Sequence, residues 1–152
     1  MTINKMGTGI AHSKLILIGE HSVVYGQPAI ALPVTILKTT VTITSSKYGQ
    51  YIENNEFRRR LDLMGDEFEG IRQLIMRLLS KFHSSKMPFS LEIDSNIPQG
   101  RGLGASASLA TAIIRAFMIS LMLNFRKKIY SFMPTFQKIL LTENLLELMW
   151  QL

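Results

Sequence analysis

Apolar and polar residues are arranged along the first two thirds of the chain in the way expected of a mixed α+β domain. Four consecutive apolar residues at 15–18 predict a short buried strand. Residues 28–36 and 39–46 are rich in β-forming residues, and the second segment alternates valine and isoleucine with threonine, which predicts a half-buried strand. A similar alternation over residues 89–93 predicts a further strand.

The segments between these strands have different patterns. Residues 47–60 are polar and include the arginine run Arg58–Arg60. This pattern predicts a surface turn or hairpin with solvated arginines and leaves a specific anion-binding role open. Residues 66–81 predict an amphipathic helix, because acids occupy the first turn and apolar residues recur at helical spacing. The apolar stripe consists of Phe68, Ile71, Leu74, Ile75 and Leu78. Met76 is also expected in or near the core.

A glycine-rich turn occupies the centre of residues 97–117. Gly100, Gly102 and Gly104 are followed by small residues and then by an apolar run that predicts a helix. Glycine permits positive φ and close approach of a ligand to the backbone. The first amides of a helix lack intrahelical partners and carry the positive end of its dipole. The turn is therefore a candidate phosphate cradle, although a purely structural loop would show the same local pattern.

Composition narrows the classes of protein to consider. The chain has 152 residues, 47% of them apolar and 18% charged, which is typical of one folded domain. It has no cysteine, so disulfides, thiolate metal sites and thiol nucleophiles are excluded, and a cytoplasmic location is expected. We predict neither a signal peptide nor a membrane span. The net charge of +6 favours anionic partners without selecting among nucleotides, polyphosphates and nucleic acids.

Two segments together resemble the GHMP kinases and, within them, the mevalonate kinase family. Residues 11–33, AHSKLILIGEHSVVYGQPAIALP, match that family's N-terminal motif of a lysine, an apolar strand and GEH followed by VVYG. Residues 97–108, IPQGRGLGASAS, resemble the superfamily's phosphate loop, P-x-x-x-G-L-G-S-S-A. The resemblance covers residues 5–117. It implies an incomplete GHMP kinase N-terminal domain of the ribosomal-S5-domain-2-like type.

The first motif implies three site residues. Lys14 resembles the family lysine near the reacting hydroxyl, where a cation lowers the cost of the charge that develops during phosphoryl transfer. Glu20 and His21 resemble the pair that lines the mevalonate pocket. Without the resemblance, a surface lysine and a satisfied loop histidine would be the simpler interpretations.

The second motif implies a phosphate loop, residues 98–107, that wraps the β- and γ-phosphates of ATP. Ser106 resembles the loop serine that binds Mg²⁺, a hard cation that takes oxygen ligands. Ala105 replaces the first serine of the usual pair, so one hydroxyl contact is absent and a modest loss of nucleotide affinity is expected. Arg101 lies within the loop and is assigned no role of its own. The residues of the loop are Pro98, Gly100, Arg101, Gly102, Leu103, Gly104, Ala105, Ser106 and Ala107.

The tail, residues 118–152, does not match the family. It is rich in leucine and methionine, and an amphipathic helix over residues 138–150 is its simplest interpretation. Residues 140–152 can also be back-translated so that a one-base shift of the reading frame encodes IAHGKPSGIDVAT. This string resembles the family motif that carries the catalytic aspartate. We therefore predict that the genuine kinase sequence ends at Phe117 and that an out-of-frame tail follows.

The resemblance predicts a truncated, inactive N-terminal part of an enzyme that phosphorylates mevalonate with ATP and Mg²⁺. The full-length enzyme could be a homodimer. Another GHMP small-molecule kinase, such as a phosphomevalonate kinase, stays open as an alternative. So does a non-catalytic nucleic-acid-binding domain, although the basic residues lack interleaved aromatics along the sequence.

Overall fold

The computed structural model describes residues 5–132. The chain divides into two compact units, Met1–Ser120 and Leu121–Leu152, and the first contains the sheet and the candidate site. The predicted out-of-frame tail lies mostly outside the described residues and stays a prediction.

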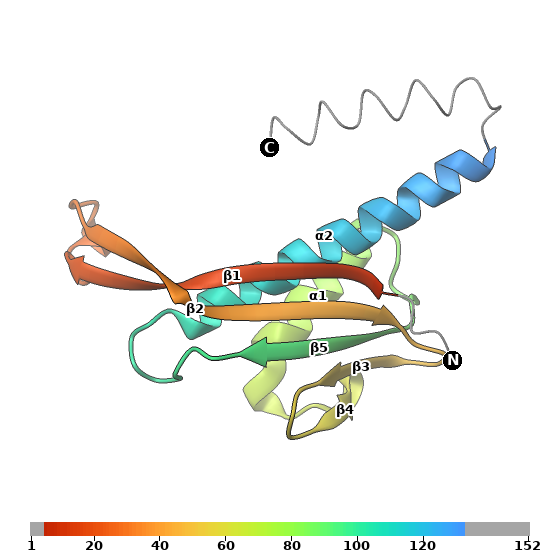
Figure 1. The fold of residues 1–152 in the computed structure, drawn as a ribbon, viewed down its shortest axis with the longest axis horizontal. Coiled ribbons are helices and arrows are strands. Elements are labelled where there is room, and N and C mark those ends of the chain that lie inside the picture. The colour runs from red at the N-terminus through yellow and green to blue at the C-terminus, as the bar shows by residue number, and fades with distance from the viewer. Residues whose placement is uncertain (1–4, 133–152) are drawn as a thin grey trace. The chain divides into compact units, whose positions relative to one another are not determined.

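A five-stranded sheet carries two helices on one face (Figure 1). The strands are β1 (Lys5–Ile18), β2 (Ile30–Ser45), β3 (Gln50–Glu53), β4 (Arg58–Arg60) and β5 (Phe89–Ser95), and the helices are α1 (Glu69–Lys81) and α2 (Ala105–Phe132). The strand order is β1-β2-β5-β3-β4, with β3 and β5 parallel and the other neighbours antiparallel. Short 3₁₀ turns occur at Val23–Tyr25, Leu61–Leu63 and Asp66–Phe68. The α+β class predicted from the sequence is confirmed.

The core lies between the sheet and the helices. Phe89 of β5 meets Phe117 of α2 edge to face, with ring centroids 5.2 Å apart, and both rings are fully buried. Val41 and Ile43 are also fully buried, which confirms the half-buried alternation in β2. Met76 is 58% exposed, so its prediction as a core residue was wrong. It follows the buried Ile75 by one position, and a helix turns successive side chains apart by about 100°.

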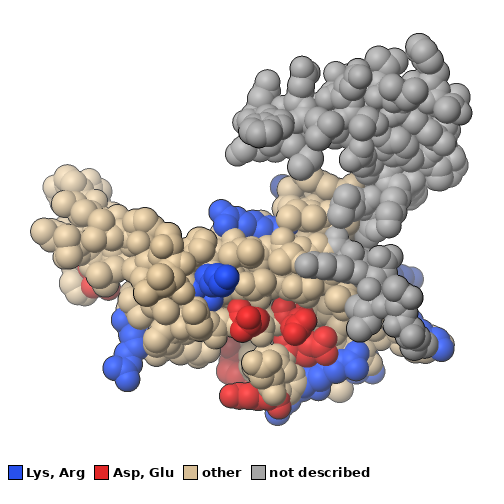
Figure 2. Space-filling view, viewed as in Figure 1, with Lys and Arg blue, Asp and Glu red and all other residues tan. Residues whose placement is uncertain are grey.

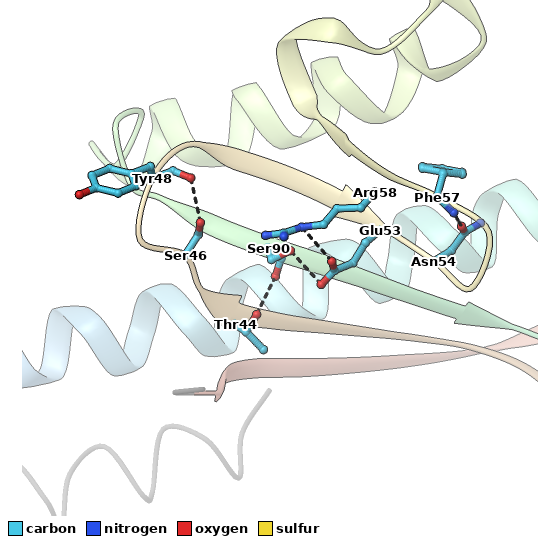
Figure 3. Close-up of polar contacts among 8 residues, drawn as sticks. All are labelled: Thr44, Ser46, Tyr48, Glu53, Asn54, Phe57, Arg58 and Ser90. Atoms are coloured by element: carbon cyan, nitrogen blue, oxygen red, sulfur yellow. Dashed lines mark hydrogen bonds and ion pairs between the residues drawn. The ribbon is translucent and has the colours of Figure 1, made fainter. Parts of the chain in front are cut away.

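The predicted surface hairpin is formed by β3 and β4 (Figure 3). The Asn54 carboxamide oxygen accepts hydrogen bonds from the backbone amides of Glu56 and Phe57, both at 2.9 Å, and so closes the turn. The Glu53 carboxylate pairs with Arg58 at 3.1 Å and accepts a hydrogen bond from the Ser90 hydroxyl at 2.9 Å. These contacts tie the hairpin to β5, and Arg58–Arg60 are exposed as predicted.

Small residues allow α2 to lie unusually close to β1. A Cβ built on Gly9 would be 2.1 Å from the Ala112 carbonyl oxygen, and one on Gly7 would be 2.5 Å from that of Ala116. Real Cβ atoms do not come so near backbone, so only glycine fits at either position. Ala112 and Ala116 are one helical turn apart and fully buried. This close packing holds the first half of α2 against β1, and with it the phosphate loop that precedes the helix.

Ser120 follows Ala116 by one turn. Its hydroxyl is buried and has no hydrogen-bond partner in the described part of the chain. Because a buried hydroxyl without a partner costs stability, we expect Ser120→Ala to leave the free energy of unfolding unchanged or to raise it by about 1 kcal/mol. Urea denaturation followed by circular dichroism measures this. A clear loss of stability would show that the hydroxyl has a partner.

The strand predicted at residues 15–18 forms, but its predicted burial was wrong. Leu17 and Ile18 are 57% and 64% exposed. This end of β1 pairs only with the first residues of β2, because β5 joins β2 from Thr39 onward. Residues 13–34 consequently form a two-stranded arm that projects beyond the rest of the sheet (Figure 1). Its surface is mainly uncharged in Figure 2.

Candidate functional site

The phosphate loop has the backbone conformation that its glycines predicted. Gly100, Gly102 and Gly104 have φ of +69°, +70° and +70°, which other residues rarely adopt. Helix α2 begins at Ala105, directly after the last of them. The first-turn amides of α2 lack intrahelical acceptors and lie at the positive end of the helix dipole. Left-handed glycines followed at once by a helix N-terminus form a typical anion-binding arrangement.

Hydrogen bonds fasten this loop to β1, an edge strand of the sheet. The Leu103 carbonyl accepts from the Ser13 hydroxyl at 2.7 Å and from the Lys14 amide at 3.3 Å. In the opposite direction, the Ser108 hydroxyl donates to the Ala11 carbonyl at 3.0 Å. The loop is therefore held in place by the strand that carries the predicted catalytic lysine.

The structure brings Lys14 and the phosphate loop together. A Cβ built on Gly104 would lie 3.1 Å from Cγ and 3.3 Å from Cε of Lys14. The aliphatic stem of the lysine therefore crosses the glycine, in space that a larger residue would take. Lys14 has no acidic partner among the described residues, so its charge is available to an anion.

A cleft of about 410 Å³ opens between the arm, β1 and the first turns of α2, a size suited to a small molecule. Besides Lys14, Gly104 and Ala107, it is lined by five polar residues that the sequence did not single out. These are His12, Ser13, Ser108, Thr111 and Arg115. Arg115 donates to the Ile10 carbonyl, and the His12 ring nitrogen Nδ1 lies 2.9 Å from the Thr35 carbonyl oxygen. Thr111 and Arg115 follow Ser108 at three- and seven-residue spacing, so helical periodicity could have located them.

Glu20 and His21 lie in the exposed turn at the tip of the arm. Gly19 opens this turn with φ of +93°, and a Cβ there would be 2.7 Å from the Pro28 carbonyl oxygen, which accounts for the glycine of the GEH motif. Neither Glu20 nor His21 lines the cleft described above. Their predicted role in substrate binding therefore stays a prediction.

Ser106 is exposed in the first turn of α2, and Pro98 and Arg101 are also exposed. The described residues contain no group of three or more His, Cys, Asp or Glu that could hold a metal ion. The Ser106 side chain carries a hydroxyl, the kind of hard oxygen donor that Mg²⁺ takes together with phosphate and water oxygens.

The arginine run is partly neutralised within its own hairpin. Arg58 pairs with Glu53, and Arg60 pairs with Asp62 at 2.7 Å. Aromatic rings do lie beside these arginines in space, contrary to the expectation from sequence order. The Arg58 guanidinium is 4.5 Å from the Tyr51 ring centroid. Because that guanidinium covers the ring, the arrangement does not favour base stacking and nucleic-acid binding.

Residues 105–122 of α2 are long and apolar enough to cross a membrane by length and composition alone. The buried residues Ala112, Ala116 and Phe117 lie within this segment. A core helix of a soluble protein passes the same test, so the segment is weak support for a membrane span.

Comparison with known proteins identifies similar chains. Residues 70–133 match the model of the GHMP kinases N terminal domain. The mevalonate kinase of Methanothermobacter thermautotrophicus is 36% identical over 106 residues, which cover 70% of this chain and 34% of that protein. The crystal structure of the Methanococcus jannaschii mevalonate kinase matches with a TM-score of 0.61 and 30% identity, over 72% of this chain and 38% of that one. The Staphylococcus aureus MRSA252 mevalonate kinase matches with a TM-score of 0.57 and 33% identity, over 76% and 38% of the two chains.

The chain spans about a third of the length of the curated relatives it matches. Over the 72% and 76% of this chain that these structures match, the fold is that of the corresponding part of those relatives.

Proposed function

The chain belongs to the GHMP kinase family as an N-terminal segment of the mevalonate kinase type, and from this premise we propose that it forms the phosphate-binding part of an enzyme that transfers the γ-phosphoryl group of ATP to mevalonate. One observation carries the proposal. Lys14 lies across Gly104, at the junction between a left-handed glycine loop and the N-terminus of α2. A cation beside an amide cradle is the arrangement that phosphoryl transfer requires.

In this proposal the loop amides and the first amides of α2 hold the β- and γ-phosphates. The Lys14 ammonium stabilises the negative charge that builds up as the γ-phosphoryl leaves ADP and joins the substrate hydroxyl. Ser106 would give one oxygen ligand to Mg²⁺, which neutralises phosphate charge when bound. Glu20 and His21, at the tip of the arm, would contact mevalonate. We expect the whole enzyme to act in the cytoplasm, and a homodimer is compatible with the family.

We expect the chain to bind ATP more tightly than ADP, and ADP more tightly than AMP, because the proposed cradle contacts the terminal phosphates. Isothermal titration calorimetry on the folded chain measures this order. Equal affinity for ATP and AMP, or no binding of ATP, would contradict the proposed cradle.

In a coupled ADP-release assay we expect no mevalonate-dependent turnover, because no described residue is assigned as the catalytic base and catalytic groups act as a unit. Turnover would show that the chain does contain a catalytic base.

The boundary at Phe117 also stays a proposal, and the match to the GHMP kinases N terminal domain continues past it to residue 133. Sequencing the coding DNA tests it directly, because the shifted frame must encode the PSGID string and further domain sequence. A downstream frame without that string would exclude the frameshift.

A further inference from the structure

We propose that Ser13 and Ser108 are positioning residues that clamp the phosphate loop onto β1 and aim its backbone at the phosphates of the ligand. This inference rests on the proposed function, because it assigns a role within the same nucleotide site. Both serines line the cleft, but each hydroxyl donates to a backbone carbonyl. Their effect is exerted through the backbone of Leu103, Gly104 and the first turn of α2.

The two hydroxyl bonds are reciprocal. Ser13 is on β1 and donates to the Leu103 carbonyl of the loop at 2.7 Å, whereas Ser108 is on α2 and donates to the Ala11 carbonyl of β1 at 3.0 Å. Both serines are almost completely buried, with 2% and 4% of their surface exposed. A buried hydroxyl without a partner is costly, so each is stable here only while it makes its bond. The pair joins segments that are 90 and 97 residues apart in sequence.

The Ser13 bond determines which way a loop amide points. The carbonyl of Leu103 and the amide N–H of Gly104 belong to one trans peptide and therefore point in opposite directions. Because the carbonyl is directed at β1, the Gly104 N–H is directed away from β1. Rotation of this peptide changes ψ of Leu103 and φ of Gly104, and glycine at the second position makes that rotation easy. The Ser13 hydroxyl opposes that rotation with the shorter of the two hydrogen bonds on the Leu103 carbonyl.

The Ser108 bond holds the beginning of α2. The Ser108 amide donates to the Gly104 carbonyl at 2.9 Å, which closes the first turn of the helix onto the last loop glycine. Its hydroxyl then fastens the same turn to β1. The free amides at the helix N-terminus are thereby fixed relative to Lys14, which lies on β1 three residues after Ala11. Preorganised donors contribute more to anion binding than donors that must be ordered on binding.

The test compares Ser13→Ala and Ser108→Ala with Ser120→Ala. Ser120 is a matched control, because its hydroxyl is equally buried but makes no hydrogen bond in the described part of the chain. Affinities for ATP, inorganic tripolyphosphate and AMP are measured by calorimetry. We expect each clamp variant to bind ATP and tripolyphosphate about tenfold more weakly, the loss of about one hydrogen bond. We expect AMP binding to be unchanged, because AMP lacks the phosphates that the loop would hold, and Ser120→Ala to match the unmodified chain. A merely structural role would not separate ATP from AMP.

Ser13→Thr retains the hydroxyl and is expected to recover tighter ATP binding than Ser13→Ala, provided circular dichroism shows that both are folded. If one clamp variant does not fold, the other still decides the inference. If the unmodified chain binds ATP more tightly than AMP and the folded clamp variants keep the same affinity for ATP as the unmodified chain, the clamp is overturned and the proposed function stands. If the unmodified chain binds neither ATP nor tripolyphosphate, the proposed function is overturned and the role of the clamp with it.

Discussion

A Gly9→Ala variant is expected to lose about 3 kcal/mol of stability, the upper end of the usual cost of overpacking a core. The added Cβ would lie 2.1 Å from the Ala112 carbonyl oxygen and 2.5 Å from the Ala116 amide nitrogen. Both atoms belong to the backbone of α2, which cannot give way as a flexible side chain can. The helix must therefore move away from β1, and the phosphate loop at its N-terminus moves with it. Urea denaturation followed by circular dichroism measures the loss.

Gly70→Ala is the matched control for this prediction. Gly70 is in helix α1, and a Cβ there meets nothing within 4 Å. Alanine is a better helix former than glycine, so this variant is expected to gain about 0.5–1 kcal/mol. Replacing glycine with alanine should thus lower the free energy of unfolding at position 9 and raise it at position 70. Equal effects at both would show that the close approach of α2 to β1 does not constrain the fold.

Lys14→Met is expected to weaken ATP binding by about ten- to a hundredfold, since a hydrogen bond involving a charged group contributes about 1.5–3 kcal/mol. Methionine keeps an unbranched apolar stem beside Gly104 but removes the charge. Lys14 is exposed and has no acidic partner among the described residues, so the midpoint of thermal unfolding should change little. Calorimetric titration with ATP, and with AMP as the ligand lacking the β- and γ-phosphates, measures the effect.

Lys47→Met is the control for Lys14→Met. Lys47 is also exposed and lies near the Tyr48 ring, 5.4 Å from its centroid, outside the residues that line the cleft. The Lys47→Met substitution changes the net charge of the chain by the same amount as Lys14→Met, so it removes the same long-range attraction for an anion. We expect ATP affinity close to that of the unmodified chain. If the two variants weaken ATP binding equally, Lys14 acts only through net charge and its assignment to the site is wrong.

The periodicity of apolar and polar residues was sufficient to predict most of the secondary structure. The alternation in β2, the hairpin of β3 and β4, and helix α1 each depend on neighbours a few residues away, and all three form as predicted. The conformation of the phosphate loop was also predictable, because its three glycines take a positive φ that other residues avoid. The family motif then indicated Lys14 as the residue beside that loop.

The burial of residues 15–18 and the contacts between distant segments of the site could be determined only from the tertiary structure. The pattern of residues 15–18 is that of a buried strand, yet this part of β1 is exposed because β5 does not extend beside it. Likewise, nothing in the local sequence pairs Ser13 with Leu103, or Ser108 with Ala11. The physical reason is that periodicity constrains the face on which a side chain lies, whereas its partner depends on how strands and helices distant in sequence come together. Lys14 reaches the phosphate loop because glycine on β1 lets α2 approach closely.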